Sequence, residues 1–182
     1  LSKFVQKLKQ ESSYLAKEAI ELPQWNGWAE GYGGFSFSAN EIDGFEDEEK
    51  SGDDGYKGVK VETLTLSQNK LSSYPTAIAK TNSYVAYIIL RANNMTEIPD
   101  EAFEYKNSVN LVSFDFSYNK LTSLPDKFHA GNMPYLYGVD LSFNSFSNFP
   151  FEPLDARSLT VFAIRSQRND KGERCLKKWP TG

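Results

Sequence analysis

The feature that most constrains this chain is a segment that recurs every 24 to 26 residues through its middle. Each copy has apolar residues at its first, fourth and sixth positions, then an asparagine, another apolar residue and a proline at constant spacing. The four regular copies begin at Val61, Val85, Leu111 and Leu136. Self-similarity at a period of about 20–50 residues is the signature of a solenoid, in which each repeat forms one coil.

Two further copies are degenerate. The first begins at Tyr32 and keeps the spacing but lacks the proline. The last opens at Leu159 and closes at Leu176, with seven extra residues placed within the stretch from Gln167 to Arg174. The sequence therefore predicts six coils, and atypical end coils are expected in a solenoid.

The apolar-x-apolar centre of each copy predicts a short strand that turns its apolar side chains inward. The asparagine that follows can donate to and accept from backbone groups that would otherwise be buried without partners. We predict a structural ladder of such side chains: Asn40, Asn69, Asn93, Asn119 and Asn144. The later proline fixes φ on the return segment, where no strand hydrogen bond is lost.

This pattern resembles the leucine-rich-repeat superfamily, in particular its 24-residue class. The resemblance implies an α/β solenoid with a curved parallel sheet of about six short strands on its concave face. It also implies an irregular or 3-10 convex side, binding of a protein or peptide, and no cofactor.

The end of the chain, from Arg168 to Leu176 and from Trp179 to Gly182, resembles that of uncharacterised secreted surface leucine-rich-repeat proteins of gut anaerobic bacteria. This implies a secreted or cell-surface protein, anchored to the outer membrane as a lipoprotein through a cysteine upstream of Leu1.

The spacing divides the chain into two regions. Residues 1–30 form an N-terminal capping helix, predicted from Ser2 to Leu22, and an aromatic segment; the helix could instead bind a partner. Residues 31–182 form the solenoid, with a degenerate first coil, an acidic connection at 41–58, regular coils at 59–158 and an inserted last coil at 159–182.

The acidic connection fits a calcium loop poorly, because an EF-hand alignment places Ala39 and Lys50 at the first and last ligand positions. A solvated loop is favoured there. At the other end, no terminal helix covers the sixth coil, which predicts an end-to-end contact with a partner or a longer array.

Composition excludes several classes of function. A net charge of −4 disfavours binding to nucleic acid. One cysteine, Cys175, and one histidine, His129, argue against disulfide frameworks and against metal sites built from several thiolates or imidazoles. No apolar run approaches about 18 residues, so no membrane insertion is expected.

Contacts with a partner are expected at outward-facing strand positions, and interface cores favour aromatic residues and arginine. The candidates are Tyr87, Arg91, Asp115, Tyr118, Asp140, Phe143 and Arg165. Six strands spaced by about 4.8 Å offer about 300 Å², far below the roughly 800 Å² of a standard interface, which suits a peptide, a glycan or a weak contact.

Asp115 and Asp140 fall on adjacent strands, and carboxylates about 5 Å apart are the arrangement of retaining glycosidases. Catalysis is disfavoured, because a shallow concave face excludes little water and Arg91 could offset their charge. The leading hypothesis is a non-enzymatic recognition module. A structural spacer or adhesin segment is the alternative, and a glycan-binding or glycan-acting protein is a third.

Overall fold

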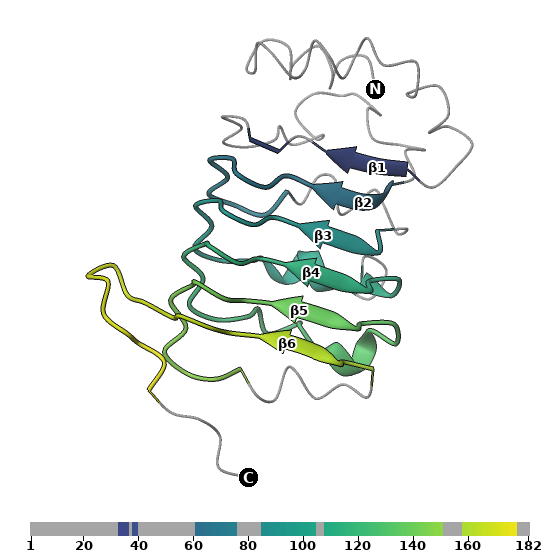
Figure 1. The fold of residues 1–182 in the computed structure, drawn as a ribbon. Helices are drawn as coiled ribbons and strands as arrows, with labels where there is room; N and C mark the ends of the chain where they lie inside the picture. The colour runs from purple at the N-terminus through teal and green to yellow at the C-terminus, as the bar shows by residue number, and fades with distance from the viewer. Residues whose placement is uncertain are drawn as a thin grey trace.

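The computed structural model describes residues 33–36, 38–39, 61–75, 85–104, 108–150 and 158–177. Within them, one parallel sheet contains six strands in sequence order (Figure 1). The strands are β1 (Gly33–Ser36), β2 (Val61–Thr65), β3 (Tyr87–Ile89), β4 (Ser113–Asp115), β5 (Gly138–Asp140) and β6 (Val161–Ala163). The predicted parallel sheet of about six short strands is confirmed.

Each strand pairs with its neighbour at the repeat spacing predicted from the sequence. Leu64 is paired with Ile88, Ile88 with Phe114 and Phe114 with Val139. The register shifts only between Gly33 and Gly34, at the start of β1. One strand per coil therefore stacks on the next, so equivalent residues of successive coils form straight rows.

The inward-facing rows make a continuous core. Leu66, Leu90, Phe116 and Leu141 are all 0% exposed. Aromatic rings fill the interior between the sheet and the return segments, with the Phe103 and Phe128 ring centroids 4.8 Å apart. In the last coil Ile164 is buried, but three other inward-facing residues are only partly buried: Leu159, Phe162 and Leu176. The end-to-end contact expected there stays a prediction.

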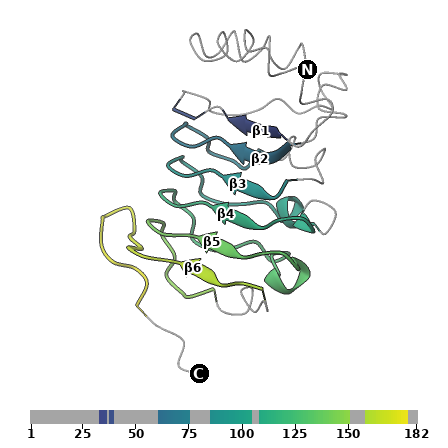
Figure 2. The same cartoon turned by 45° about the vertical axis from the view of Figure 1, so that its right-hand side comes forward.

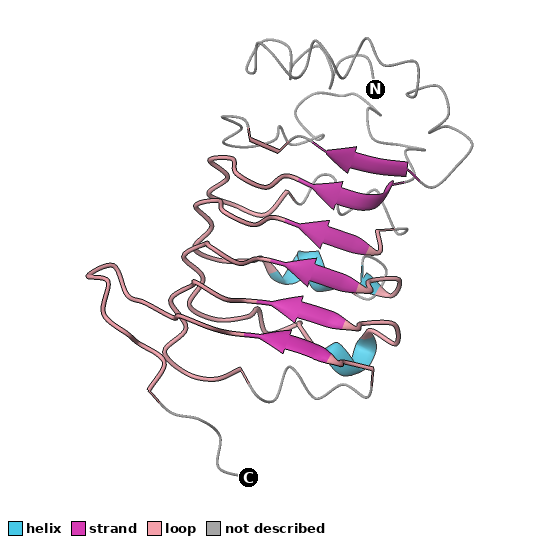
Figure 3. Cartoon of the chain, in the orientation of Figure 1, coloured by secondary structure: helices cyan, strands magenta, loops and turns pink. Residues whose placement is uncertain are grey.

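The return segments are irregular, with two 3-10 helices, η2 (Asp100–Phe103) and η3 (Ala130–Asn132) (Figure 3). Pro99 directly precedes η2 in an extended conformation, with φ of −72°. Ala102 and Phe103 of η2 are buried and pack into the core. This matches the expected convex side.

Asparagine side chains connect consecutive coils after each strand. The Asn119 Oδ1 accepts a hydrogen bond from the Met95 N–H at 3.0 Å, and its Nδ2 donates to the carbonyls of Leu90 and Phe116. The Phe116 carbonyl accepts a second bond from Asn144, at 2.9 Å. Each ladder amide therefore shares its carbonyl acceptors with the amides of the neighbouring coils.

The ladder continues in the last coil through a glutamine, not an asparagine. The Gln167 Oε1 accepts from the Phe146 N–H at 3.0 Å, and its Nε2 donates to the Leu141 carbonyl at 2.8 Å. Gln167 therefore takes the ladder position of the last coil, at the start of the stretch in which seven extra residues are expected. Residues 168–174 form a protruding loop, closed by an antiparallel bridge between Arg168 and Arg174 (Figure 2).

Several predicted features lie outside the described residues. They are the N-terminal capping helix and aromatic segment at 1–30, Asn40 of the ladder and the acidic connection at 41–58.

Candidate functional site

One residue of each coil, just before the ladder position, has a left-handed backbone. These residues have φ between 55° and 60°: Ala39, Gln68, Ala92, Tyr118, Phe143 and Ser166. In the first five of these residues the N–H bonds a carbonyl of the next coil, as in the 2.9 Å bond from Tyr118 to the Ser142 carbonyl. Because this conformation crowds Cβ against the following carbonyl, a large side chain here is costly. Tyr118 and Phe143 nevertheless occupy two of the six positions.

Three of the predicted contact residues form a single stack on the concave face. The rings of Tyr118 and Phe143 lie 4.0 Å apart between centroids, at an interplanar angle of 14°. The Arg91 guanidinium carbon lies 4.1 Å from the centroid of the Tyr118 ring. Tyr118 is 40% exposed and Phe143 37%, so the stack is open to solvent. The sequence places these residues on three successive coils, and the structure brings them into contact.

A buried serine holds Arg91 in place. The Arg91 Nη1 donates to the Ser117 Oγ at 2.9 Å, and Ser117 is 0% exposed. Ser117 and Ser142 are both buried, although they occupy the same repeat position as the exposed Arg91 and Arg165. Arg91 donates a hydrogen bond to Ser117 and stacks on the Tyr118 ring. Within the described residues it makes no ion pair with Asp115.

Asp115 and Asp140 are direct register partners on β4 and β5. The Oδ1 of Asp115 accepts from the Ser117 N–H, and the Oδ1 of Asp140 accepts from the Ser142 N–H, both at 2.8 Å. Each carboxylate therefore closes a local turn at the end of its own strand. This accounts for both residues without a catalytic role.

Tyr87 lies apart from the stack, in the row at the beginning of the strands. In the sheet Tyr87 pairs with Ser113, and the same row continues with Gly138 and Val161. Three exposed large hydrophobic residues near these strand starts were not among the predicted contacts: Tyr135, Tyr137 and Val161. Tyr137 directly follows the first inward-facing residue of its repeat, a position that could have been read from the spacing.

Arg165 lies after the last strand, at the far end of the Arg91 row. Its backbone N–H donates to the Ser142 Oγ at 3.1 Å. Within the described part of the chain its guanidinium makes no hydrogen bond, ion pair or ring contact. It is exposed beside Ser166, the last of the left-handed positions.

Comparisons with known proteins identify this architecture. No family model matches the chain. Lumican from Oryctolagus cuniculus is 30% identical over 96 residues. A leucine-rich repeat protein from Bacteroides eggerthii is similar in structure, with a TM-score of 0.69 and 37% identity over 85% of this chain. Another, from Bacteroides thetaiotaomicron, has a TM-score of 0.62 and 44% identity over 67% of this chain.

The chain belongs to the leucine-rich-repeat superfamily. The residues matched to lumican are 52% of this chain and 47% of lumican, and the two structural matches cover 27% and 15% of the Bacteroides chains. The chain therefore spans only part of each of these relatives. The superfamily assignment indicates a protein-interaction module, and nothing in the comparisons points to catalysis.

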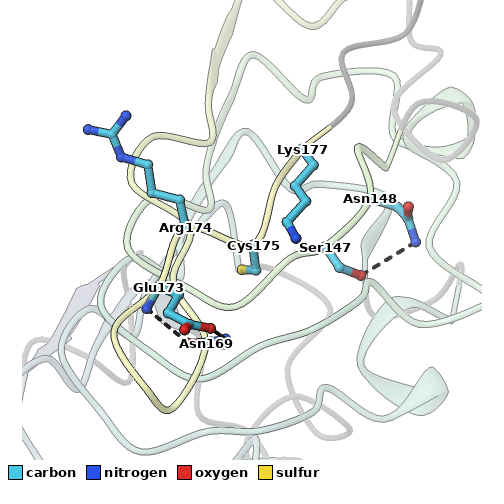
Figure 4. Close-up of a pocket in the computed structure, with 7 residues that line it drawn as sticks. All are labelled: Ser147, Asn148, Asn169, Glu173, Arg174, Cys175 and Lys177. Carbon is cyan, nitrogen blue, oxygen red and sulfur yellow. Dashed lines mark hydrogen bonds between the residues drawn. The ribbon is translucent and has the colours of Figure 1, made fainter.

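The leucine-rich-repeat coils also leave a hollow of about 680 Å³ beneath the protruding loop (Figure 4). Its lining residues are Ser147, Asn148, Asn169, Glu173, Arg174, Cys175 and Lys177. Asn169 donates to Glu173 at 2.9 Å, and the Cys175 thiol donates to the Phe146 carbonyl at 3.2 Å. Figure 4 shows Lys177 directed toward Ser147 and Arg174 directed away from the hollow. These contacts stabilise the loop against the preceding coil.

The described ranges contain no group of three or more histidine, cysteine, aspartate or glutamate residues placed to hold a metal ion. Among the same residues, no helix has the length and apolarity needed to cross a membrane.

Proposed function

We propose that this chain is a non-enzymatic recognition module, which binds a protein or peptide partner through the concave sheet and adjacent loops. The observation that supports this most is the exposed stack of Arg91, Tyr118 and Phe143 on consecutive coils. Aromatic residues and arginine dominate the energetics of protein interfaces because they offer large contact areas. The small area of the sheet favours a peptide segment over a globular surface.

The backbone conformation strengthens this interpretation. Left-handed positions that serve only the fold can be occupied by small or flexible residues, as at Ala92 and Ser166. At Tyr118 and Phe143 a large side chain is present despite the conformational free-energy cost, and more than a third of each side chain is exposed to solvent. Exposed aromatic rings held by a rigid solenoid lose little conformational entropy when a partner binds.

We also propose that the protein is exported and displayed at the cell surface as an outer-membrane lipoprotein. This part is supported by the resemblance of its final segment to secreted surface proteins of gut anaerobic bacteria. Protease treatment of intact cells tests it: a surface protein is digested while a cytosolic marker is spared. Protection of the protein in intact cells, with digestion after lysis, would contradict surface display.

Panning a random-peptide phage library against the whole chain tests recognition. We expect selected peptides that bind the native chain and lose at least tenfold in affinity with the combined variant Arg91→Ala, Tyr118→Ala, Phe143→Ala. A matched control carries three exposed substitutions away from the stack: Lys120→Ala, Thr122→Ala and Ser123→Ala. Unchanged thermal unfolding of both variants shows that the fold is intact. Equal binding to both variants, or no selectable peptide, would support the spacer alternative.

A further inference from the structure

From the open end of the stack we infer a slot that receives an aromatic side chain of a partner peptide with an acidic neighbour. The inference rests on the proposed function and specifies its ligand. Arg91 covers one face of the Tyr118 ring, and Phe143 covers the other. The stack therefore runs from coil to coil, and the outer face of Phe143 is directed toward the sixth coil.

The sixth coil leaves the next place in this stack empty. Its left-handed residue is Ser166, with φ of 55°, compared with 57° for Phe143 and 56° for Tyr118. The Phe143 N–H bonds the Arg165 carbonyl at 2.7 Å, so the two coils remain in register at this point. Ser166 therefore starts from the same backbone geometry as the two aromatic residues, but it has no ring. A flat group above Ser166 would continue the stack at the same spacing.

The opposite end of the stack shows how the chain fills such a place when it supplies the group itself. Ala92 is also too small to stack, and the Arg91 guanidinium takes the position beside Tyr118. At the sixth coil, Arg165 stands in the same place relative to Ser166 but makes no ring contact within the described residues. Ser166 is exposed and Phe143 is 37% exposed, so among the described residues the slot beside Phe143 is open.

The geometry and the charge of the slot select its occupant. A group that continues the stack would lie about as far from the Phe143 ring as the Tyr118 ring does, 4.0 Å between centroids, and this suits a flat ring better than a puckered sugar. The exposed Arg165 disfavours a second cation and favours a carboxylate. Ser166 also lines a hollow of about 230 Å³ together with Arg168 and Arg174. Residues 158–177 carry five cationic and two acidic side chains, so this end attracts an acidic segment.

Asp115 and Asp140 place two carboxylates on neighbouring strands in the middle of the sheet, β4 and β5. Each already has one carboxylate oxygen bonded to a backbone N–H of its own coil. Their charge disfavours an acidic ligand over the middle of the sheet. The acidic residue of the peptide is therefore expected to lie toward Arg165, with the rest of the segment running over the sixth coil.

NMR titration of the whole chain with acetyl-Gly-Trp-Glu-Gly-amide tests the slot. We expect saturable shifts centred on the Phe143 ring and on the amides of Arg165 and Ser166. Replacing the tryptophan of the peptide by leucine is expected to weaken binding by about three- to tenfold, since the stacking contribution is lost. Replacing its glutamate by glutamine is expected to weaken binding by up to about fivefold.

The decisive variant is Ser166→Phe, which fills the slot with a ring from the chain itself. We expect this variant to bind the peptide with an affinity at least tenfold lower than that of the native chain. The matched control is Gln68→Phe, which places the same ring at the equivalent left-handed position of the second coil, away from Phe143. It is expected to leave binding unchanged. Equal affinity of both variants and the native chain would overturn the slot.

Two further outcomes separate the slot from the proposed function. Selected peptides that need Arg91, Tyr118 and Phe143 but bind Ser166→Phe normally would retain recognition and refute the slot. Shifts at Phe143 and Ser166 with cellohexaose, but not with the peptide, would refute the peptide assignment in favour of a glycan. A chain that binds no peptide in either assay would refute both the slot and the recognition function.

Discussion

Sharing of carbonyl acceptors along the asparagine ladder makes a quantitative prediction about stability. Asn144 is 2% exposed; its Oδ1 accepts from the Leu121 N–H at 2.9 Å, and its Nδ2 donates to the Phe116 and Leu141 carbonyls. In Asn144→Ala both carbonyls keep a second partner, because Asn119 still bonds Phe116 and Gln167 still bonds Leu141. Of these groups, only the Leu121 N–H loses its hydrogen-bond partner.

One buried N–H without a partner costs about 1–3 kcal/mol, and the lost side-chain volume adds to this. We therefore expect Asn144→Ala to lower the free energy of unfolding by about 2–4 kcal/mol. The double variant Asn119→Ala, Asn144→Ala also removes both donors to the Phe116 carbonyl. Its loss should exceed the sum of the single losses by about 1–3 kcal/mol.

Urea unfolding followed by circular dichroism measures these differences in a double-mutant cycle. The control pair is Asn93 with Asn144, because these two side chains donate to no carbonyl in common. The control losses should add within about 0.5 kcal/mol. An additive result for Asn119 with Asn144, or equal coupling in both pairs, would refute the shared-acceptor reasoning.

Three other predictions concern single positions. Burial raises the pKa of Tyr74 above its ordinary value, so the unfolded chain ionises first and stability should fall as pH rises past about 10; Tyr74→Phe should reduce that fall in alkaline urea titrations, whereas exposed Tyr135→Phe should not. Gln68→Gly should raise the free energy of unfolding by up to about 1 kcal/mol by relieving its left-handed backbone, with Gln68→Ala as a neutral control in thermal unfolding. Phe116→Ala should cost about 3–5 kcal/mol in urea, because its ring is fully buried, and a loss under 1 kcal/mol would argue against that placement.

Much of the fold could be predicted because repetition makes each position visible several times. The spacing from Leu64 to Leu66 and Asn69 recurs with every coil, so strand, inward face and ladder position follow from one argument. The structure confirms the parallel register. The ladder role of Gln167 was not predicted, because the repeat pattern calls for asparagine and an insertion follows this position. The Gln167 amide makes the same kind of hydrogen bonds through a side chain that is one methylene longer.

The candidate site was predictable only as a set of outward-facing residues. Sequence spacing places Arg91, Tyr118 and Phe143 on neighbouring coils, but it does not show that a left-handed backbone turns both rings into one stack. It also does not show that Ser117 turns inward and holds Arg91. Such rotations depend on backbone dihedrals after the strand, which a pattern of apolar residues does not encode.

The arrangement of one parallel strand per coil can be tested directly by NMR in solution, from contacts between backbone protons of neighbouring strands. The structure predicts contacts in parallel register that pair Leu64 with Ile88, Ile88 with Phe114 and Phe114 with Val139. Close Hα–Hα contacts typical of antiparallel pairing, or a register displaced by one residue, would contradict the solenoid and every surface derived from it.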